Sequence, residues 1–190
     1  MKNILVINRK GGCGKTLISD EIAFAFDRMN IPYNFYDLDG QGGVIHSPIQ
    51  IDIAVASIID TPGALQSSMG DWIDDADLII IPTRPTPTDL PATNTTIDLV
   101  RQHNAEDKII YVVNGSNRFR ATSDFLDFFR EKHKGEIIHV IPQSEAFTQA
   151  KFRQQSVCEY SPKSPAAISI DSLVAIINKL LGLKSINHDL

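Results

Sequence analysis

Residues 9–16, Arg-Lys-Gly-Gly-Cys-Gly-Lys-Thr, have the types and spacing that phosphate binding requires. The general phosphate-loop pattern is a glycine, four free residues and then Gly-Lys-Ser/Thr; Gly14, Lys15 and Thr16 match it, whereas Arg9 stands at the first glycine position. The glycines let the backbone curl and turn several N–H groups inward, at the positive end of the following helix. We therefore expect Lys15 to reach the terminal phosphates of a nucleotide and Thr16 to ligate Mg²⁺.

A second lysine, Lys10, precedes the glycines of this loop. A cation at this place on a curled loop tends to point away from the phosphates that its own loop surrounds, so Lys10 is free to reach another chain. The alternative is that Lys10 is an ordinary solvated lysine beside a turn that only joins a strand to a helix.

Two carboxylates, Asp37 and Asp39, follow the second apolar run at alternate positions. Carboxylates at a strand end suit magnesium and water: Asp37 would hold a magnesium-bound water, and Asp39 would orient the water that attacks a γ-phosphate. The alternative is a surface turn, where Asp-Gly pairs are common. The third apolar run ends in Asp60, which we expect in the second shell of the magnesium ion, followed by a turn at residues 61–63 that senses the γ-phosphate.

Later strand ends offer weaker candidates. The fourth run leads into a proline-rich exit, residues 82–89, whose path the prolines fix, and Asp89 at its end is also placed to cap a helix. The fifth run ends at Asn114, whose amide has both a donor and an acceptor for the edge of an adenine, although a turn residue is an equally simple interpretation.

The apolar runs themselves predict the sheet that would hold these residues together. Runs without polar alternation are typical of strands buried on both faces. They cover residues 4–7, 33–38, 53–59, 78–81, 109–113 and 137–141, with helical spacing at 17–29, 90–102, 123–132 and 168–183. This alternation predicts an α/β fold, a doubly wound, mostly parallel sheet with helices on both faces, which binds ligands beyond the carboxyl ends of its strands.

Length and composition indicate one domain, residues 1–190. A chain of 190 residues, 43% of them apolar, fills one core and is too short for two domains of typical size. The net charge of −5 excludes a polycation that coats nucleic acid, so DNA binding needs a local basic patch. Two cysteines give no disulfide framework, and no apolar run suits a leader or a membrane span, so we expect a cytoplasmic protein.

The segment from Lys10 to Thr16 resembles the deviant Walker A motif of the ParA/MinD family of dimeric P-loop ATPases. Residues 37–43 are similar to the family's Asp-x-Asp-Pro-Gln-Gly element, with Gly40 in place of the usual proline, and residues 60–63 and 82–89 are similar to its next two motifs. The resemblance covers nearly the whole chain. It is closest to the short plasmid-partition ParA type, because no helix-turn-helix region precedes the first strand.

The resemblance implies a role for each matching residue. Lys10 crosses a dimer interface to the partner's nucleotide and, with Lys15, neutralises charge on the transferring phosphoryl group, while Asp39 positions the attacking water. Magnesium is held by Thr16, Asp37 and Asp60. The switch and dimer contacts are Asp60, Thr61, Pro62, Gly63, Pro85 and Asp89. The other nucleotide contacts are Gly11, Gly12, Cys13, Gly14, Leu17, where many relatives have a second threonine, Asn114 and Pro142.

The function that the resemblance implies is DNA partition. Two protomers sandwich ATP and Mg²⁺ at their interface, and the homodimer binds DNA non-specifically and so associates with the nucleoid. A small centromere-binding protein of ParB or ParG type stimulates the weak hydrolysis and releases the dimer. The basic residues that either form a DNA-facing patch or remain a solvated face are Arg118, Arg120, Arg130, Lys132, Lys134, Lys151, Arg153 and Lys163.

Two other function classes remain open. The first is a MinD-like spatial regulator with a protein or membrane-associated cargo; since the last helix has only Lys179 and Lys184 on its polar face, we expect no stable membrane attachment. The second is a metabolic synthetase of the same superfamily that phosphorylates a carboxylate. It would need a substrate pocket, and the chain has no insertion to build one.

Overall fold

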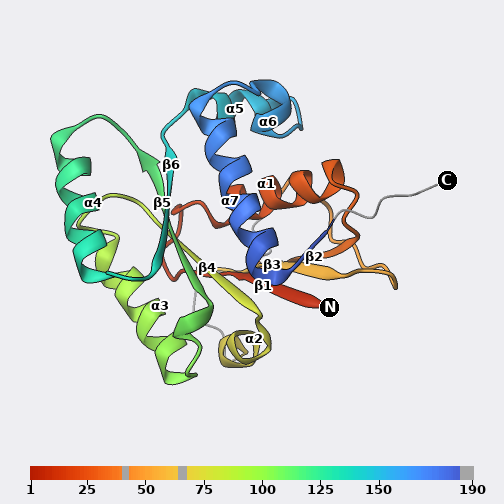
Figure 1. Cartoon of the computed structure of the whole chain (residues 1–190), viewed down its shortest axis with the longest axis horizontal. Helices are drawn as coiled ribbons and strands as arrows, with labels where there is room; N and C mark the ends of the chain where they lie inside the picture. The colour runs from red at the N-terminus through yellow and green to blue at the C-terminus, as the bar shows by residue number, and fades with distance from the viewer. Residues whose placement is uncertain (40–42, 64–67, 185–190) are drawn as a thin grey trace.

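The computed structural model describes residues 1–39, 43–63 and 68–184. These residues form one six-stranded sheet in which every pair of neighbours is parallel (Figure 1). The strands are β1 (Lys2–Val6), β2 (Tyr33–Asp37), β3 (Ala56–Asp60), β4 (Leu78–Thr83), β5 (Ile109–Ser116) and β6 (Ile137–Pro142). Their order across the sheet is β2-β3-β1-β4-β5-β6. The predicted doubly wound parallel sheet is therefore confirmed.

Helices cover both faces of the sheet (Figure 1). One face carries α1 (Lys15–Arg28), α5 (Glu145–Phe152), α6 (Val157–Tyr160) and α7 (Pro165–Leu181). The other carries α2 (Met69–Asp75), α3 (Leu90–Gln102) and α4 (Arg120–Lys132), and a 3-10 turn, Glu106–Lys108, precedes β5. None of the described helices has the length and apolar character needed to cross a membrane.

Residues that alternate along a strand enter two separate cores. In β1, Ile4 and Val6 belong to the core under α1 and α7, whereas Leu5 belongs to the core under α2, α3 and α4. All three side chains are fully buried. Because both faces of the sheet are covered, the central strands are continuously apolar rather than alternating.

The boundaries of some elements differ from the prediction. β3 begins at Ala56 rather than at residue 53, because the Ala54 N–H donates to the Ile51 carbonyl (3.2 Å) and closes a turn before the strand. α7 begins three residues earlier than predicted, since the Ser164 hydroxyl caps it by accepting from the Ala167 N–H at 3.2 Å. It ends before Gly182, whose φ of +66° is left-handed. α4 also begins three residues before its predicted start.

β1 marks the point at which the chain changes direction across the sheet. From β1 the chain passes to β2 and returns to β3 on one side, and it then crosses to β4 on the other side of β1. Such a reversal opens a crevice beyond the carboxyl ends of the strands. The segments that follow β1, β2, β3 and β4 meet at this edge.

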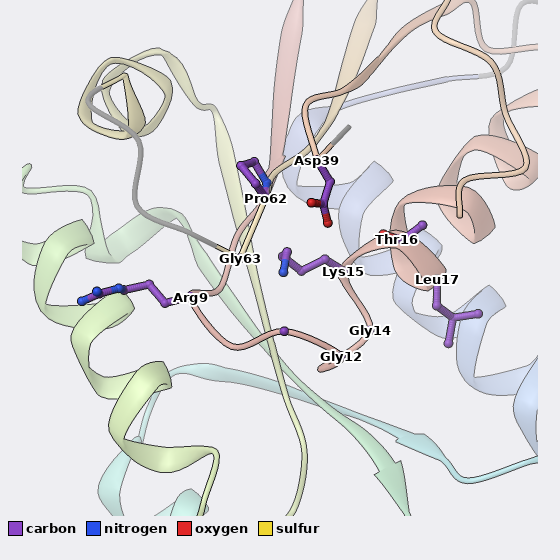
Figure 2. A pocket seen from close by; sticks show the side chains of 10 residues that line it. Arg9, Gly12, Gly14, Lys15, Thr16, Leu17, Asp39, Pro62 and Gly63 are labelled. Carbon is purple, nitrogen blue, oxygen red and sulfur yellow. The ribbon is translucent and has the colours of Figure 1, made fainter. Parts of the chain in front are cut away.

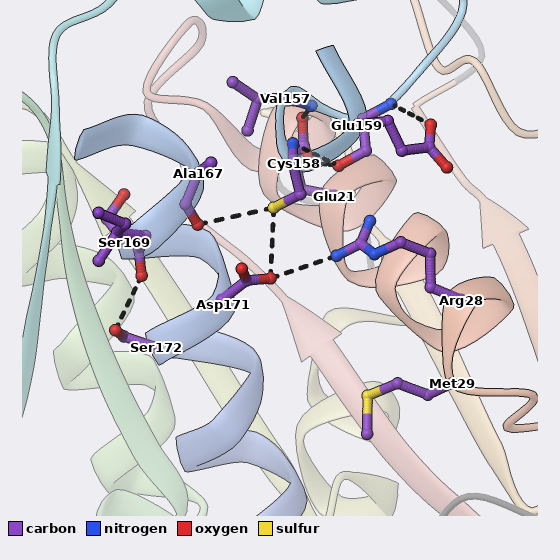
Figure 3. Close-up of polar contacts among 12 residues, drawn as sticks. Glu21, Arg28, Met29, Val157, Cys158, Glu159, Ala167, Ser169, Asp171 and Ser172 are labelled. Atoms are coloured by element: carbon purple, nitrogen blue, oxygen red, sulfur yellow. Dashed lines mark hydrogen bonds and ion pairs between the residues drawn. The ribbon is translucent and has the colours of Figure 1, made fainter. Parts of the chain in front are cut away.

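Polar contacts fasten α1 to α6 and α7 (Figure 3). The buried Glu21 carboxylate accepts hydrogen bonds from the Ser156 hydroxyl (2.6 Å) and the Val157 N–H (2.9 Å). Burial raises the pKa of Glu21, although both hydrogen bonds act to lower it. About two turns further along α1, the Arg28 guanidinium lies 3.3 Å from the Asp171 carboxylate of α7. These contacts hold the helix whose first turn belongs to the phosphate loop.

Candidate functional site

A cavity of about 630 Å³ lies beyond the carboxyl ends of β1, β2 and β3 (Figure 2). The phosphate loop runs along one side of it, and the segments after β2 and β3 form another. The lining residues are Arg9, Gly11, Gly12, Gly14, Lys15, Thr16, Leu17, Asp39, Pro62 and Gly63. The structure thus brings together predicted residues from three separate strand ends.

Gly14 has a backbone conformation that other residues rarely adopt. Its φ is +108°, it stands at the N-cap of α1, and no side chain caps this helix. A Cβ atom at Gly14 would overlap the amide nitrogen of Asn114. The first N–H groups of α1 therefore remain available to an anion in the cavity.

Lys15 lines the cavity although the residue is only 5% exposed. Its Nζ donates to the backbone carbonyl of Lys10 at 3.4 Å. In Figure 2 the side chain crosses the middle of the cavity. An ammonium group has three donors, so Lys15 keeps donors for the oxygens of a phosphate.

Thr16 and Asp60 meet at the same edge of the cavity. The Thr16 hydroxyl donates to Asp60 Oδ2 at 2.7 Å. Asp60 is fully buried, and its Oδ1 has no hydrogen-bond partner among the described residues. Burial raises the pKa of Asp60 to about 6, against the smaller opposing effects of the Thr16 hydrogen bond and the Lys15 charge.

This arrangement fits a divalent cation that also binds phosphate. The orphaned Asp60 oxygen and the Thr16 hydroxyl are hard oxygen ligands, which Mg²⁺ prefers. Within residues 1–39, 43–63 and 68–184, no group of three or more His, Cys, Asp or Glu side chains could hold a metal ion alone. Mg²⁺ commonly takes only one or two protein carboxylates and completes its shell with phosphate and water oxygens.

Asp37 and Asp39 occupy different positions. Asp39 lines the cavity, its side chain points into it in Figure 2, and its Oδ1 has no partner among the described residues. Asp37 is not among the lining residues; it pairs with Asp60 across β2 and β3 and accepts the Asp39 N–H at 3.1 Å. Asp37 therefore supports the turn that presents Asp39. Gly40, where relatives have proline, lies outside the described residues.

Lys10 turns away from the cavity that its own loop surrounds. It is absent from the lining, its side chain is 40% exposed, and its Nζ lies 3.9 Å from Asp89 Oδ1. Asp89 is the N-cap residue of α3, but its side chain makes no capping hydrogen bond. Its Oδ1 instead accepts from the Thr86 hydroxyl at 3.1 Å. The carboxylate is thus directed at Lys10 rather than at the helix.

Asn8, which the sequence analysis did not select, links the phosphate loop to α3. It is fully buried, and its Nδ2 donates to the Pro82 carbonyl (2.7 Å) and the Thr93 hydroxyl (3.0 Å). Its Oδ1 accepts the Lys10 N–H at 2.9 Å. The signal in the sequence was a single amide directly after an apolar strand, and the two groups that accept from it, on Pro82 and Thr93, lie more than 70 residues away.

Asn114 lies behind the phosphate loop and also lines a second cavity. Its Nδ2 donates to the Cys13 carbonyl at 3.0 Å. The second cavity, of about 320 Å³, is lined by Arg84, Pro85, Thr86, Asn114, Gly115, Asn117, Thr122 and Gln143. Pro142 pairs with Ser116 in the sheet and does not line either cavity. Of the two predicted base contacts, Asn114 therefore lines a cavity, whereas Pro142 does not; the next residue, Gln143, which follows β6, lines it instead.

The turn after β3 runs against the phosphate loop. The Thr61 hydroxyl donates to the Val6 carbonyl at 2.9 Å and is fully buried. Pro62 and Gly63 line the cavity, and a Cβ atom at Gly63 would lie 3.5 Å from the Arg9 carbonyl oxygen. A displacement of this turn would therefore be transmitted to the loop.

Comparison with known proteins identifies relatives of this architecture. A family model described as the CobQ/CobB/MinD/ParA nucleotide binding domain matches residues 4–157. No curated protein matches the chain.

Three solved structures share the fold at low sequence identity. The septum site-determining protein MinD complexed with Mg-ADP from Pyrococcus horikoshii has a TM-score of 0.73 and 15% identity, covering 95% of this chain and 97% of that chain. An ATP complex of a McdA variant from Cyanothece has a TM-score of 0.77 and 13% identity, covering 97% of this chain and 97% of that chain. A ParA family ATPase from Chlorobium tepidum has a TM-score of 0.71 and 20% identity, covering 93% of this chain and 99% of that chain.

Proposed function

The chain belongs to the CobQ/CobB/MinD/ParA nucleotide-binding domain family, and from this we propose that residues 1–190 are one ParA-type ATPase domain that acts in DNA partition. Its cofactors are ATP and Mg²⁺. Two protomers sandwich the nucleotides and bind DNA non-specifically, and a small centromere-binding protein of ParB or ParG type stimulates weak hydrolysis. The dimer is cytoplasmic and associates with the nucleoid while ATP is bound.

The observation that carries the proposal is the bond between Thr16 and Asp60 beside the phosphate loop, at 2.7 Å. The Thr16 hydroxyl and the free oxygen of Asp60 would hold Mg²⁺ or one of its waters, and the ion would neutralise charge on the phosphates. Asp37 is paired with Asp60 in the sheet, and its carboxylate adds negative charge beside Asp60 that favours a bound cation. The backbone N–H groups of residues 11–17 surround the phosphates.

Hydrolysis needs a positioned water and neutralised charge. Asp39 orients the water, because its side chain lines the cavity and its Oδ1 has no partner among the described residues. Lys15 neutralises charge on the β- and γ-phosphates of its own nucleotide. Asn114 contacts the base from the second cavity.

Lys10 acts on the nucleotide of the partner subunit. Its side chain is 40% exposed, does not line its own cavity and lies beside Asp89, at the end of the loop that contains Pro85. The turn of residues 61–63 and the loop that ends at Asp89 face the partner. A γ-phosphate that displaces the turn would therefore favour the dimer.

DNA binding by a protein of net charge −5 requires basic side chains that reach the phosphates locally. Arg118 and Arg120 lie at the start of α4, and Lys151 and Arg153 lie at the end of α5. The Arg120 side chain is 94% exposed. Such side chains neutralise phosphates without reading sequence.

A MinD-like spatial regulator is the second candidate, because solved MinD structures share this fold. The apolar stripe of α7 is used in the core, where Ile170 and Leu173 are 1% exposed, so we propose no stable membrane attachment.

Binding to DNA and to membranes separates the two candidates. Fluorescence anisotropy with two unrelated DNA duplexes, and co-sedimentation with anionic liposomes, are measured with ATPγS and with ADP. We expect equal binding to both duplexes with ATPγS only, and none by the Lys15→Ala variant. Liposome binding without DNA binding would instead support the MinD-like function.

A further inference from the structure

His46 lies between two carboxylates of α1, outside the phosphate site. Its Nδ1 is 3.0 Å from Asp20 Oδ1, and its Nε2 is 3.3 Å from Asp27 Oδ2. The Asp20 side chain is only 5% exposed, and it also accepts the backbone N–H groups of Ile45 (3.0 Å) and His46 (3.1 Å). Asp20, Asp27 and His46 together form what we call the α1 clamp.

The clamp requires a positively charged imidazole ring. Because both neighbours of the ring are carboxylates, both ring nitrogens must donate, and only the protonated ring does so. Burial lowers the pKa of His46, but the hydrogen bonds and charges of Asp20 and Asp27 outweigh burial and raise it to about 9. The other groups around the ring are aromatic: Phe24 of α1 at 4.3 Å and Phe35 of β2 at 5.7 Å between centroids.

Two further ionisable groups lie near the clamp. Tyr33 of β2 has its pKa raised by burial and by the Asp27 carboxylate, so it stays neutral across the physiological range. Lys151 of α5 donates to the backbone carbonyl of Gly43, at the start of the segment that His46 anchors. The segment of residues 43–46 is thus held from α1 and from α5.

This segment is connected to Asp39 by three residues. A connection of three residues spans at most roughly 14 Å between the flanking Cα atoms, so the anchored position of Gly43 restricts where Asp39 can lie. Asp20 stands four residues after Thr16, on the same side of α1. The clamp therefore ties the chain that carries Asp39 to the helix that begins at the phosphate loop.

We propose that His46 is a positioning residue for ATP hydrolysis, which holds residues 45 and 46 against α1 and so keeps the Asp39 carboxylate beside Lys15 and Thr16. The inference rests on the ATPase function proposed above. It assigns no contact between His46 and the nucleotide. Loss of the clamp should therefore lower kcat and leave the binding of Mg-ATP unchanged.

The test compares wild type with His46→Gln, which retains one amide donor and does not titrate. His103→Gln is the matched control, because His103 also bonds a carboxylate, Asp74 at 2.7 Å, but on the opposite side of the sheet. kcat and KM for Mg-ATP are measured with DNA from pH 6.5 to 10. We expect His46→Gln to lower kcat about tenfold with KM within about twofold of wild type. The wild-type kcat should fall as pH rises through about 9, and this fall should be absent from His46→Gln.

Nitrogen-15 spectra of the ring provide a readout that does not depend on turnover or on the variant's folding. We expect both nitrogens of His46 to carry protons at pH 7.5. A neutral ring at that pH would overturn the inference, as would a His46→Gln variant with the kcat of wild type. The latter result leaves the ATPase function standing, whereas wild type without any ATP turnover would refute both.

Discussion

The ammonium group of Lys10 lies 3.9 Å from the buried carboxylate of Asp89 in its own subunit. The nearest oxygen, Asp89 Oδ1, also accepts from the Thr86 hydroxyl, and Asp89 Oδ2 has no hydrogen-bond partner among the described residues. If Lys10 acts on the partner's nucleotide, it must leave Asp89 when the dimer forms. The pair therefore restrains the lysine in the isolated subunit.

Asp89→Asn should strengthen the ATP-dependent dimer. Removing the charge frees Lys10. An ion pair of a solvent-exposed lysine contributes about 0.2–1 kcal/mol, and two such pairs break in each dimer, so the dimer dissociation constant should fall about two- to thirtyfold. Analytical ultracentrifugation with ATPγS measures it. Asp98→Asn is the control, since it removes the same charge from a solvent-exposed pair with Arg101 on α3 (3.7 Å) and leaves Lys10 paired. A weaker dimer of Asp89→Asn would mean that Asp89 binds the partner rather than restraining Lys10.

Asp60→Asn should stabilise the ligand-free protein while it abolishes binding of Mg-ATP. The native state binds a proton at Asp60 more tightly than the unfolded chain does, because burial raises the pKa to about 6. The charged form therefore costs stability above that pH, and the substitution should add about 1–3 kcal/mol to the free energy of unfolding at pH 7. Urea denaturation measures this gain, which should shrink as pH falls toward 4.

Asp77→Asn is the control, because it should change the free energy of unfolding in the opposite direction. Lys2 and the Asn3 N–H lower the pKa of Asp77 and outweigh its burial, so the charged form is stabilising. Asp77→Asn should therefore destabilise the protein at pH 7. Equal destabilisation by both substitutions would contradict the assignment of Asp60 as an uncompensated buried charge.

The affinity for Mg-ATP should depend on pH through Asp60. A cation needs the ionised carboxylate, and with a pKa of about 6 the ionised fraction falls about tenfold between pH 7 and pH 5. Titration with a fluorescent ATP analogue at both pH values, with and without Mg²⁺, measures the change. We expect about tenfold weaker magnesium-dependent binding at pH 5. A constant magnesium effect across this range would exclude Asp60 from the metal site.

Asn8→Ala should weaken both the fold and the phosphate loop. It removes the buried partner of the Lys10 N–H and of the Pro82 carbonyl, whereas the Thr93 hydroxyl keeps its contacts with Thr83 and Asp89. Unsatisfied buried groups cost about 1–3 kcal/mol each, so we expect a loss of several degrees in Tm and weaker ATP binding. Asn3→Ala, which alters half-buried contacts at the opposite end of β1, should lower Tm without weakening ATP binding. Unchanged ATP binding by a folded Asn8→Ala protein would contradict this role.

The fold and the core of the site could be predicted because their signals are local. The central strands are buried on both faces and are therefore visible as apolar runs, and parallel strands carry the residues after Val6, Asp37 and Asp60 to one edge. The curl of the phosphate loop also predicted that the Lys10 side chain points away from the cavity, and Lys10 is not among the residues that line it.

Other parts of the site depend on contacts that no local pattern reveals. Asn8 is bonded to residues 74 and 85 positions away, and His46 meets α1 at Asp20, 26 positions back. Asp89 has the sequence context of a helix cap, but the approach of Lys10 and Thr86 gives its carboxylate other partners. Pairings of this kind are set by packing of distant elements, which composition and spacing do not specify.

The dimeric state of Lys10→Ala with ATP tests the central claim most directly, with Lys15→Ala beside it. Sedimentation velocity with ATPγS and Mg²⁺, together with nucleotide affinity, distinguishes the two lysines. We predict that Lys10→Ala binds nucleotide within about threefold of wild type but remains monomeric and hydrolyses little ATP, whereas Lys15→Ala loses nucleotide binding itself. A Lys10→Ala protein that dimerises and hydrolyses ATP like wild type would contradict the sandwich dimer.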